Sequence, residues 1–483
     1  MSTTTATLER QALIDGRWTD GAAGTMEVRS PYDGRLVGTT TRCDAADVDR
    51  AVAAAVAAQK AWARTSLVER VELFERAMTI AEERNEAIAQ LITAEMGKTI
   101  REAREEMVQY ATPHFRRAAQ DALRHHGTTR PSTEEPTNRK RIMTTRRPLG
   151  VIGVIGPYNF PVDIPMIPVL YGIIAGNAVV WKPSEKAPLC CAMVVDVLLE
   201  AGLPAGVLSF VPGAGDVGAA LVEHPDVAGI QFTGSTDVGK RIARAAELKR
   251  TLLELGGNGP QIVFADADLD AAVEAATMGC FYMAGQVCTA AERILVHRDR
   301  YDEFVERLAA KAAELRMGDP AEEATDMGPL VDDATLAKVR RHVEDARRAG
   351  ATVIQPEAPG GLFYPPTVLR DVTPEMEIAR EETFGPVAPV IPFETLEEAI
   401  AIANDSPYAL NAAAFTADLD TAWAICDALD HGTVLINETT NYWDQMAPFG
   451  GAKQSGIGRE LGGIQMLDTV TEPKTLVFNV GRG

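Results

Sequence analysis

The residue best suited to covalent chemistry in this sequence is Cys288, in the segment GQVCT at residues 285–289. A cysteine that follows a helical pattern and has glycine and small polar neighbours can serve as a nucleophile, because the thiolate is the reactive form and its surroundings activate it. A buried, inert cysteine is the alternative, and it is the better interpretation for a cysteine that stands alone. The nucleophile hypothesis therefore depends on the motifs that accompany Cys288.

Two further segments offer groups that such a nucleophile needs. Glu254 ends the apolar stretch TLLE at residues 251–254, and two glycines follow it closely. A carboxylate at the carboxyl end of a strand lies where α/β enzymes place their sites, and an apolar pocket would raise its pKa and suit it to act as a general base. Asn159, in GPYNFP at 156–161, can direct an amide N–H at an oxyanion. The alternative for Glu254 is a solvated glutamate, and the alternative for the Asn159 segment is an ordinary turn.

Three glycine-rich or polar segments have the composition of a nucleotide site. FTGSTDVGK at 232–240 predicts a strand, a turn and a helix whose N-terminal N–H groups can bind phosphate. GAGDVG at 213–218 spells the dinucleotide fingerprint, and we interpret it as a turn that borders an adenosine. WKPSE at 181–185 places Lys182 and Glu185 after an apolar strand, where they can hold ribose hydroxyls; ordinary surface residues are the alternative.

Strands that alternate with helices are expected to position these motifs. This alternation predicts an open, mostly parallel sheet with helices on both faces, followed by a second α/β region. The expected strands are 150–155, 178–182, 207–211, 229–232, 249–254 and 260–263, and the expected helices between them are 165–175, 187–201, 216–223 and 236–247. Helices are also expected at 51–62, 68–84, 86–96 and 100–124 before this sheet, and at 270–283, 300–313, 333–349, 396–404 and 419–429 after it. Residues 125–147 predict an exposed ribbon, and 467–479 a final strand.

Composition limits the class of protein. A chain of 483 residues with 46% hydrophobic and 24% charged residues is typical of a soluble globular protein with two or three domains. Its net charge of −21 should repel nucleic acid and anionic membranes, so we expect neither as a partner. The cysteines lack zinc-site spacing, which predicts no metal and free thiols in the cytoplasm. The N-terminus has no signal-peptide pattern, and the longest uncharged run, 164–181, is broken by proline and glycine.

In their order along the chain, these motifs resemble those of the aldehyde dehydrogenase superfamily. The resemblance runs from about Leu13 to Phe478 and rests on GPYNFP, WKPSE, FTGSTDVGK, LELGGN, GQVCTA, EETFGPV and APFGGAKQSGIGRE. It implies an α/β fold with a doubly wound NAD-binding domain (1–124 and 148–255), an α/β catalytic domain (256–456) and a small bridging sheet (125–147 and 457–483). Because that sheet pairs between subunits in the family, a homodimer or homotetramer is expected.

The resemblance also implies a role for individual residues. Cys288 matches the nucleophile, Glu254 the general base, Asn159 part of the oxyanion hole, and Glu460 an acid that assists proton transfer from behind the site. The implied cofactor-binding residues are Ile155, Gly156, Pro157, Lys182, Ser184, Glu185, Gly215, Phe232, Thr233, Gly234, Ser235, Leu255, Gly256, Glu382 and Phe384.

The implied reaction is oxidation of an aldehyde to a carboxylic acid with NAD(P)+. Cys288 attacks the aldehyde, and a hydride then passes from the aldehyde carbon to the nicotinamide. The nicotinamide cofactor is needed because no protein group accepts a hydride. Water activated by Glu254 finally hydrolyses the thioester. Glu254 favours hydrolysis, because branches that pass the acyl group to coenzyme A usually lack a base here. Glu185 favours NAD, because a carboxylate repels the 2′-phosphate of NADP, although NADP remains possible.

The same comparison predicts a substrate pocket and a substrate class. Branches that oxidise succinate semialdehyde often carry arginine at the position of Tyr282, and those that oxidise a phosphorylated triose often carry it at the position of Val287. Neither arginine is present, so we expect the substrate to be an uncharged aromatic or aliphatic aldehyde. Arg104, Arg116 or Arg117 could still supply an anchor for an anionic substrate from another direction. The expected lining is Tyr158, Asp163, Ile164, Ile167, Tyr282, Val287, Trp443 and Phe449, and packing is the alternative role for the aromatic residues.

Other activities stay open at this point. A semialdehyde or a betaine-type aldehyde is an alternative substrate, and Asp163 with the aromatic residues would suit a cation. A thiol esterase or acyl transferase that uses Cys288 and Glu254 without a nucleotide is a different class. A catalytically silent binding protein is a third class, and it would be indicated by loss of either residue.

Overall fold

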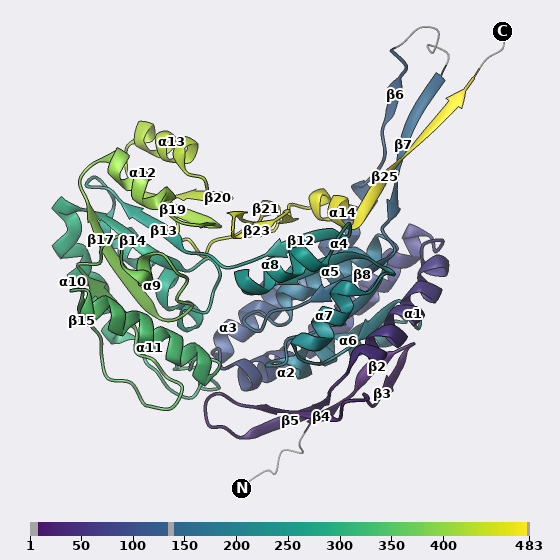
Figure 1. Cartoon of the computed structure of the whole chain (residues 1–483), viewed down its shortest axis with the longest axis horizontal. Helices are drawn as coiled ribbons and strands as arrows, with labels where there is room; N and C mark the ends of the chain where they lie inside the picture. Colours follow the sequence, from purple (N-terminus) through teal and green to yellow (C-terminus); the bar gives the residue numbers. More distant parts are fainter. Residues whose placement is uncertain (1–7, 134–139, 481–483) are drawn as a thin grey trace.

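Two large sheets form the two lobes of the molecule in the computed structural model, which describes residues 8–133 and 140–480 (Figure 1). The first sheet has eight strands in the order β23-β12-β11-β8-β9-β10-β2-β3, and the second has seven in the order β15-β16-β17-β14-β13-β19-β20. Each lobe has a hydrophobic core of its own. The predicted α/β class, with a doubly wound sheet and a second α/β region, is confirmed.

Five parallel strands make the centre of the first sheet. They are β8 (Val151–Ile155), β9 (Ala178–Lys182), β10 (Leu208–Phe210), β11 (Val227–Thr233) and β12 (Arg250–Glu254). These strands are continuous apolar runs because helices cover both faces of the sheet. The hairpin of β2 (Ala12–Ile14) and β3 (Arg17–Thr19) extends one edge, and β23 (Gly456–Ile457) pairs antiparallel with β12 at the other. In the hairpin turn, Asp15 and Gly16 both have positive φ, as a two-residue turn of type I′ requires.

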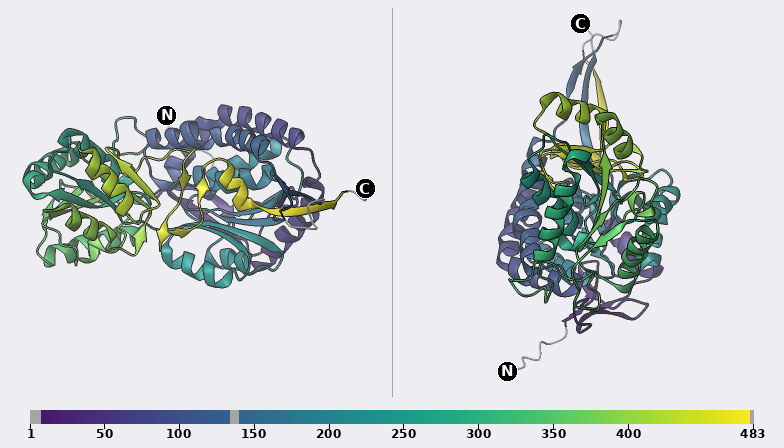
Figure 2. Two further views of the ribbon diagram at one scale, coloured as in Figure 1. Left: turned by 90° about the horizontal axis from the view of Figure 1, so that it is seen from above. Right: turned by 90° about the vertical axis from the view of Figure 1, so that its left-hand side faces the viewer.

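Helices on both faces bury this sheet (Figure 2). One face is covered by α2 (Leu67–Met96), α4 (Pro113–Arg124), α5 (Asp163–Ile174) and α6 (Pro188–Glu200), whose side chains share one core cluster with Ile152 and Val179. The other face is covered by α1 (Ala45–Trp62), α7 (Gly215–Glu223) and α8 (Thr236–Ala245), which share a second cluster with Val151 and Val180. Alternate residues of one strand thus belong to opposite cores, as the two-residue strand period requires.

The second sheet is parallel except at one edge. Its strands are β13 (Gly259–Val263), β14 (Ala291–His297), β16 (Thr367–Arg370), β17 (Val387–Phe393), β19 (Asn411–Phe415) and β20 (Thr433–Ile436), with β15 (Thr352–Ile354) antiparallel at the edge. The helices of this lobe are α9 (Leu269–Phe281), α10 (Arg298–Glu314), α11 (Asp333–Arg348), α12 (Leu396–Asn404) and α13 (Leu419–Ala428). The chain crosses from the first sheet to the second after Glu254. The carboxyl end of β12 and the start of β13 therefore lie at the boundary of the two lobes.

A three-stranded ribbon projects from the first lobe (Figure 1). It contains β6 (Thr129–Pro131), β7 (Lys140–Pro148) and β25 (Thr471–Asn479), and β25 pairs with all nine residues of β7. The two segments that were predicted to form a bridging sheet therefore do pair with each other; residues 134–139 of the predicted ribbon lie outside the described residues. A separate small sheet of β1 (Leu8–Arg10), β5 (Leu36–Thr41) and β4 (Thr25–Arg29) lies near the N-terminus.

Several element boundaries differ from the sequence prediction for identifiable reasons. The helices predicted at 68–84 and 86–96 are one helix, α2, because no proline or glycine interrupts this stretch and the capping box at Ser66 starts a single helix. The helix predicted at 100–124 is divided into α3 (Ile100–Glu105), a π-helical turn (Glu106–Ala111) and α4, since Pro113 cannot continue the preceding helix.

The last predicted strand is also shorter than expected. The helix α14 (Ile464–Val470) occupies the first part of the segment 467–479, because its apolar residues reach the core on one helical face. Among the described residues, none of the helices combines the length and apolar character that a membrane crossing requires.

Candidate active site

A large cavity opens where the strand order of the first sheet reverses. The chain proceeds from β8 through β9 to β10 on one side of β8, and β11 and β12 lie on the other side. Ligands of doubly wound folds bind at this switch point, beyond the carboxyl ends of the strands. The cavity measures about 740 Å³ and begins at the ends of β8 and β11.

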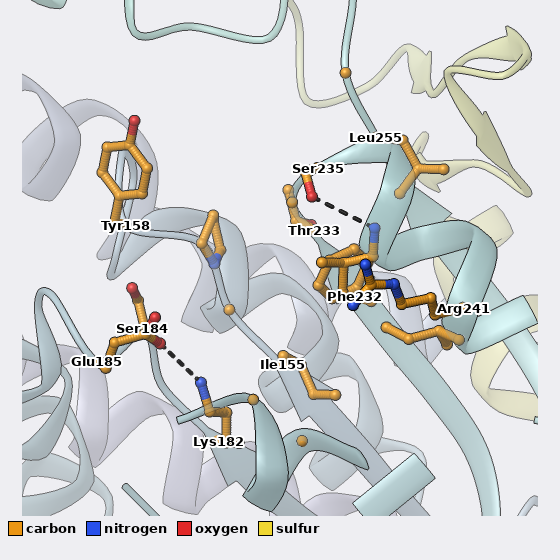
Figure 3. A pocket seen from close by; sticks show the side chains of 18 of the residues that line it. Ile155, Tyr158, Lys182, Ser184, Glu185, Phe232, Thr233, Ser235, Arg241 and Leu255 are labelled. Carbon is orange, nitrogen blue, oxygen red and sulfur yellow. Dashed lines mark hydrogen bonds and ion pairs between the residues drawn. The ribbon is translucent and has the colours of Figure 1, made fainter. Parts of the chain in front are cut away.

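Every residue that was predicted to bind the cofactor lines this cavity. Figure 3 shows Lys182 and Glu185 on one side and Ser235 and Arg241 on the other. Lys182 Nζ lies 3.1 Å from Glu185 Oε2. Burial opposes ionisation of Glu185, but the Lys182 ammonium and further hydrogen bonds overcome it, so the pKa of Glu185 lies below its ordinary value. Glu185 is therefore a carboxylate at the cavity wall.

The cavity also has the features that a bound dinucleotide needs. Ser235 caps α8 by accepting a hydrogen bond from the Val238 N–H, and the free N–H groups of this helix end and of α7 can bind phosphate. Gly215 begins α7, and a Cβ at this position would meet no atom within 4 Å, so its backbone faces open space. The volume lies in the ordinary range of ligand pockets. The residues present thus fit a nicotinamide dinucleotide.

The loop that carries Cys288 is held in a conformation that glycine makes possible. It begins with the 3₁₀ turn Tyr282–Gly285, in which Met283, Ala284 and Gly285 have positive φ. A Cβ on Gly285 would lie 2.1 Å from the Gly385 carbonyl oxygen. A Cβ on Gly257 would lie 2.1 Å from the Cys288 carbonyl oxygen. These two glycines therefore allow the loops after β12 and before β17 to pack directly against the cysteine loop.

Asn159 and Cys288 line the same cavity, so the loop after β8 meets the cysteine loop. The Asn159 side-chain amide donates a hydrogen bond of 3.0 Å to the Gln286 carbonyl oxygen, two residues before Cys288. An asparagine amide carries a second N–H, which is available for another acceptor. The predicted oxyanion group is thus fixed to the loop of the predicted nucleophile.

Carboxylates surround the partly buried thiol of Cys288. Burial raises its pKa above the ordinary range, and the charges of Glu382, Glu254 and Glu460 raise it further. Burial also raises the pKa of Glu254, with a contribution from Glu460 that the Arg459 guanidinium and the Gly451 N–H oppose. Neither Glu254 carboxylate oxygen makes a hydrogen bond of ordinary geometry within the protein. A buried carboxylate without such bonds is suited to take up a proton.

A second, smaller cavity of about 70 Å³ reaches Cys288 from the other side. Seven of the predicted substrate-pocket residues line it: Asp163, Ile164, Ile167, Tyr282, Val287, Trp443 and Phe449. Tyr158 lines the larger cavity instead, where its ring lies 6.0 Å from the Phe384 ring and 4.6 Å from Lys186 Nζ. Glu460 and the residues that sequence reasoning missed complete the lining: Glu105, Tyr110, Phe160, Met278, Thr289, Asn441 and Leu461.

The carboxyl groups are the only acid or base side chains that line the smaller cavity, apart from Cys288 and the tyrosines, among the described residues. They are Glu105, Asp163 and Glu460, and none of the lysines or arginines in the described ranges lines it. None of the three arginines considered as an anion anchor, Arg104, Arg116 and Arg117, lines this cavity. Arg104 is bound to Glu86 and Glu323 on the surface, and Arg117 lies close enough to Asp163 for the two charges to interact. The electrostatic character of this cavity therefore disfavours an anion.

Three glutamates on one helical segment hold the two loops of the site together, and the sequence did not reveal them. Glu106 Oε1 accepts hydrogen bonds of 3.0 Å from the N–H groups of Val162 and Asp163, at the start of α5. Glu102 accepts a hydrogen bond of 2.8 Å from the Met283 N–H in the cysteine loop. Glu105 accepts one of 3.0 Å from the Tyr282 hydroxyl.

A buried ion pair supports this arrangement. Lys98 Nζ lies 2.6 Å from Glu106 Oε2, both side chains are fully buried, and the ammonium also lies 4.1 Å from the centre of the Phe160 ring. The π-helical turn begins at Glu106, and such turns are frequent at functional sites. No local pattern in the sequence indicates that these acidic residues face inward, because acidic residues on a helix are usually solvated.

Comparisons with known proteins agree with this geometry. The model of the aldehyde dehydrogenase family matches residues 18–476. The chain is 41% identical to 3-sulfolactaldehyde dehydrogenase of Pseudomonas putida, with 94% of each chain covered, and 40% identical to betaine aldehyde dehydrogenase of Rhizobium leguminosarum, with 97% of each covered. The solved NAD-dependent aldehyde dehydrogenase of Sinorhizobium meliloti superposes with a TM-score of 0.94 at 37% identity, over 99% of this chain and 96% of that one. The chain belongs to the aldehyde dehydrogenase family.

Proposed function

We propose that this protein oxidises an aldehyde without a negative charge to the carboxylic acid, with NAD+ as the cofactor and Cys288 as the nucleophile. The observation that carries the proposal is the position of Cys288, which lines both the large cavity at the strand switch point and the small cavity on the other side. A nucleophile at this boundary can meet a substrate from one side and a cofactor from the other. The description of the Sinorhizobium meliloti relative as NAD-dependent supports the cofactor.

The cofactor would be held by the residues of the large cavity. Lys182 and Glu185 would bind the adenosine ribose, Gly234 and Ser235 the pyrophosphate, and Glu382 the nicotinamide ribose. When bound, the nicotinamide accepts the hydride that leaves the aldehyde carbon. We propose NAD over NADP because the Glu185 carboxylate would repel a 2′-phosphate.

The protein groups would act in two stages. In the first, the Cys288 thiol, whose pKa is raised, gives up its proton to solvent as its sulfur bonds to the aldehyde carbon, and the oxyanion accepts hydrogen bonds from the Asn159 amide and the Cys288 N–H. In the second, Glu254 takes a proton from water as the water oxygen bonds to the thioester carbon. The C–S bond then breaks, which releases the acid and restores the thiolate. Glu460 would receive the proton from Glu254, because the two carboxyl groups lie close enough for the Glu460 charge to raise the pKa of Glu254.

The acidic lining of the small cavity supports an uncharged aromatic or aliphatic aldehyde and argues against a semialdehyde anion. The same lining supports a second candidate, a cationic betaine-type aldehyde, because carboxylates and aromatic rings both attract a cation. The substrates in the names of the two sequence relatives, 3-sulfolactaldehyde and betaine aldehyde, are chemically different. The choice of substrate class therefore rests on the cavity.

We further propose the domain division and the assembly that the motifs suggest. Residues 1–124 and 148–255 would bind NAD, 256–456 would carry the nucleophile, and the ribbon 125–147 with 457–483 would pair between copies in a homodimer or homotetramer. The exposed side chains of Val477 and Phe478 on β25 support a contact there. All six cysteines are free, which supports a cytoplasmic location. Among the described residues, none of the His, Cys, Asp and Glu clusters could hold a metal ion.

The test measures NADH formation with a panel of aldehydes, using NAD and NADP in turn. The panel contains benzaldehyde-type, medium aliphatic, succinate-semialdehyde-type and betaine-type members. We expect turnover of uncharged members with NAD, abolished in Cys288→Ala. Turnover of the semialdehyde alone would refute the assignment of substrate class, and NADH formation by Cys288→Ala would refute the mechanism. Ester hydrolysis without any NADH formation would favour the thiol esterase.

A further inference from the structure

A third cavity lies behind the catalytic carboxylates. It has a volume of about 10 Å³, and Glu254 and Glu460 both line it. The strand residues Val154, Gln231 and Leu252 form part of its wall. This volume is about that of one enclosed water, which needs roughly 10–15 Å³ and two to four polar partners.

Gln231 and Thr233 are the neutral polar residues that line this cavity, and Gln231 is the fully buried one of the two. It lies on β11, the central strand between β8 and β12, and its register partner on β12 is Leu252. Because successive side chains of a strand alternate between faces, Gln231 points to the same face as Leu252 and Glu254. The sheet geometry therefore places the amide on the same face as the carboxylate of the general base, beside the cavity that both residues line.

The polar atoms at this place lack partners within the protein. Gln231 is 2% exposed, and neither its Oε1 nor its Nε2 has a hydrogen-bond partner. The oxygens of Glu254, which is 4% exposed, make no hydrogen bond of ordinary geometry. A buried amide without partners costs about 1–3 kcal/mol, so such groups in native proteins are usually bonded to ordered water. The unpartnered amide of Gln231 and the Glu254 carboxylate, which makes no hydrogen bond of ordinary geometry, border a water-sized space and thus indicate a binding site for water.

We propose that Gln231 is a positioning residue that holds one ordered water between Glu254 and Glu460, and that this water transfers the proton of the deacylation step. This inference rests on the proposed role of Glu254 as the base. Glu254, protonated by the hydrolytic water, donates that proton to the held water. The held water in turn donates one of its own protons to the Glu460 carboxylate, which regenerates the Glu254 carboxylate. Glu460 also lines the small cavity, from which the proton reaches solvent.

The kinetic test uses an activated ester and no cofactor, so that acylation and deacylation of Cys288 are measured in one experiment. The burst of p-nitrophenolate from p-nitrophenyl acetate reports acylation and counts active sites, and the steady rate reports deacylation. In Gln231→Met, which keeps the length of the side chain and removes its polar atoms, we expect an unchanged burst and a steady rate about five- to tenfold lower, the value of one lost hydrogen bond. We also expect the solvent deuterium isotope effect on the steady rate to change, which a purely structural role would not cause.

The matched control is Gln261→Met. Gln261 is fully buried on β13 of the other sheet, where its amide donates a hydrogen bond of 2.8 Å to the Ala272 carbonyl. We expect this variant to keep the steady rate per active site. An equal loss in both variants, or no loss in Gln231→Met, overturns the proposal. Glu254→Gln separates the two levels of inference, because an unchanged steady rate in that variant refutes the proposed base itself.

A second measurement does not depend on the stability of a variant. A crystal structure of the wild-type protein at high resolution should contain an ordered water within hydrogen-bond distance of Gln231 and Glu254. Absence of that water from a well-ordered site overturns the proposal.

Discussion

Replacement of Gly450 by alanine should displace the general base. Gly450 follows the short strand β21 (Pro448–Phe449) and has a φ of +149°. A Cβ at this position would lie 2.6 Å from Glu254 Oε1 and 2.9 Å from the Gly458 carbonyl oxygen. Because the second neighbour is backbone, the Glu254 side chain is the group that must move.

The structure sets the size of the effect. The contact to Oε1 is about 0.8 Å short of an ordinary contact of 3.4 Å. Misplacement of a reacting group by about 1 Å costs on the order of a hundredfold in rate. We therefore expect deacylation in Gly450→Ala to fall by about 30- to 100-fold. Acylation should change less, because the three atoms nearest to this Cβ position belong to Glu254, Gly458 and Arg459 and not to Cys288 or Asn159.

The assay is again the burst of p-nitrophenolate followed by the steady rate. The control is Gly350→Ala, since Gly350 also has a positive φ, of +109°, but its Cβ would meet no atom within 4 Å. Both variants therefore carry backbone strain of about 1–3 kcal/mol, and only Gly450→Ala also has the contact with Glu254. The difference between the two variants thus reports the effect of that contact. A steady rate in Gly450→Ala that equals that of Gly350→Ala would refute the reasoning.

Three further predictions concern charges. Lys98→Met leaves Glu106 buried without its ion pair, so the free energy of unfolding in urea should fall by about 3–5 kcal/mol. The control, Arg104→Met, removes an exposed ion pair and should lower the free energy of unfolding by no more than about 1 kcal/mol. Equal losses in the two variants would contradict the argument. The pKa of Glu460 is raised from 4.5 to about 8 in the folded protein, which binds that proton more tightly than the unfolded chain. The free energy of unfolding should therefore fall as the pH rises from 4.5 to about 8, and it should fall less steeply in Glu460→Gln than in the wild-type protein. Parallel profiles of urea midpoint against pH for the two proteins would contradict this prediction. Glu185→Gln removes the charge that repels a 2′-phosphate, so the ratio of kcat/KM with NADP to that with NAD should rise about tenfold, and an unchanged ratio would show that Glu185 does not select the cofactor.

Much of the fold and of the large cavity could be predicted from local sequence. The apolar strands and the glycine-rich turns of the cofactor region are short-range signals, because strand period and turn chemistry act within a few residues. For the same reason, the loop of Asn159, the end of β12 at Glu254 and the loop of Cys288 were recognisable, and all three reach the cavities. Helix boundaries were less predictable, as α2 and the π-helical turn at Glu106 show, since they depend on packing against distant elements.

The sequence by itself determined which chemical groups the protein carries and the order of the strands and turns that hold them. Only the tertiary structure decided which of these groups meet. Glu106 lies more than fifty residues before the loop it holds, and Gly450 lies far beyond the glutamate it faces, so no local pattern could connect either pair. The assignment of Tyr158 to the larger cavity and of Gln231 to the smallest one was likewise decided by the direction of single side chains. Such directions depend on sheet register and loop packing, which are long-range properties of the fold.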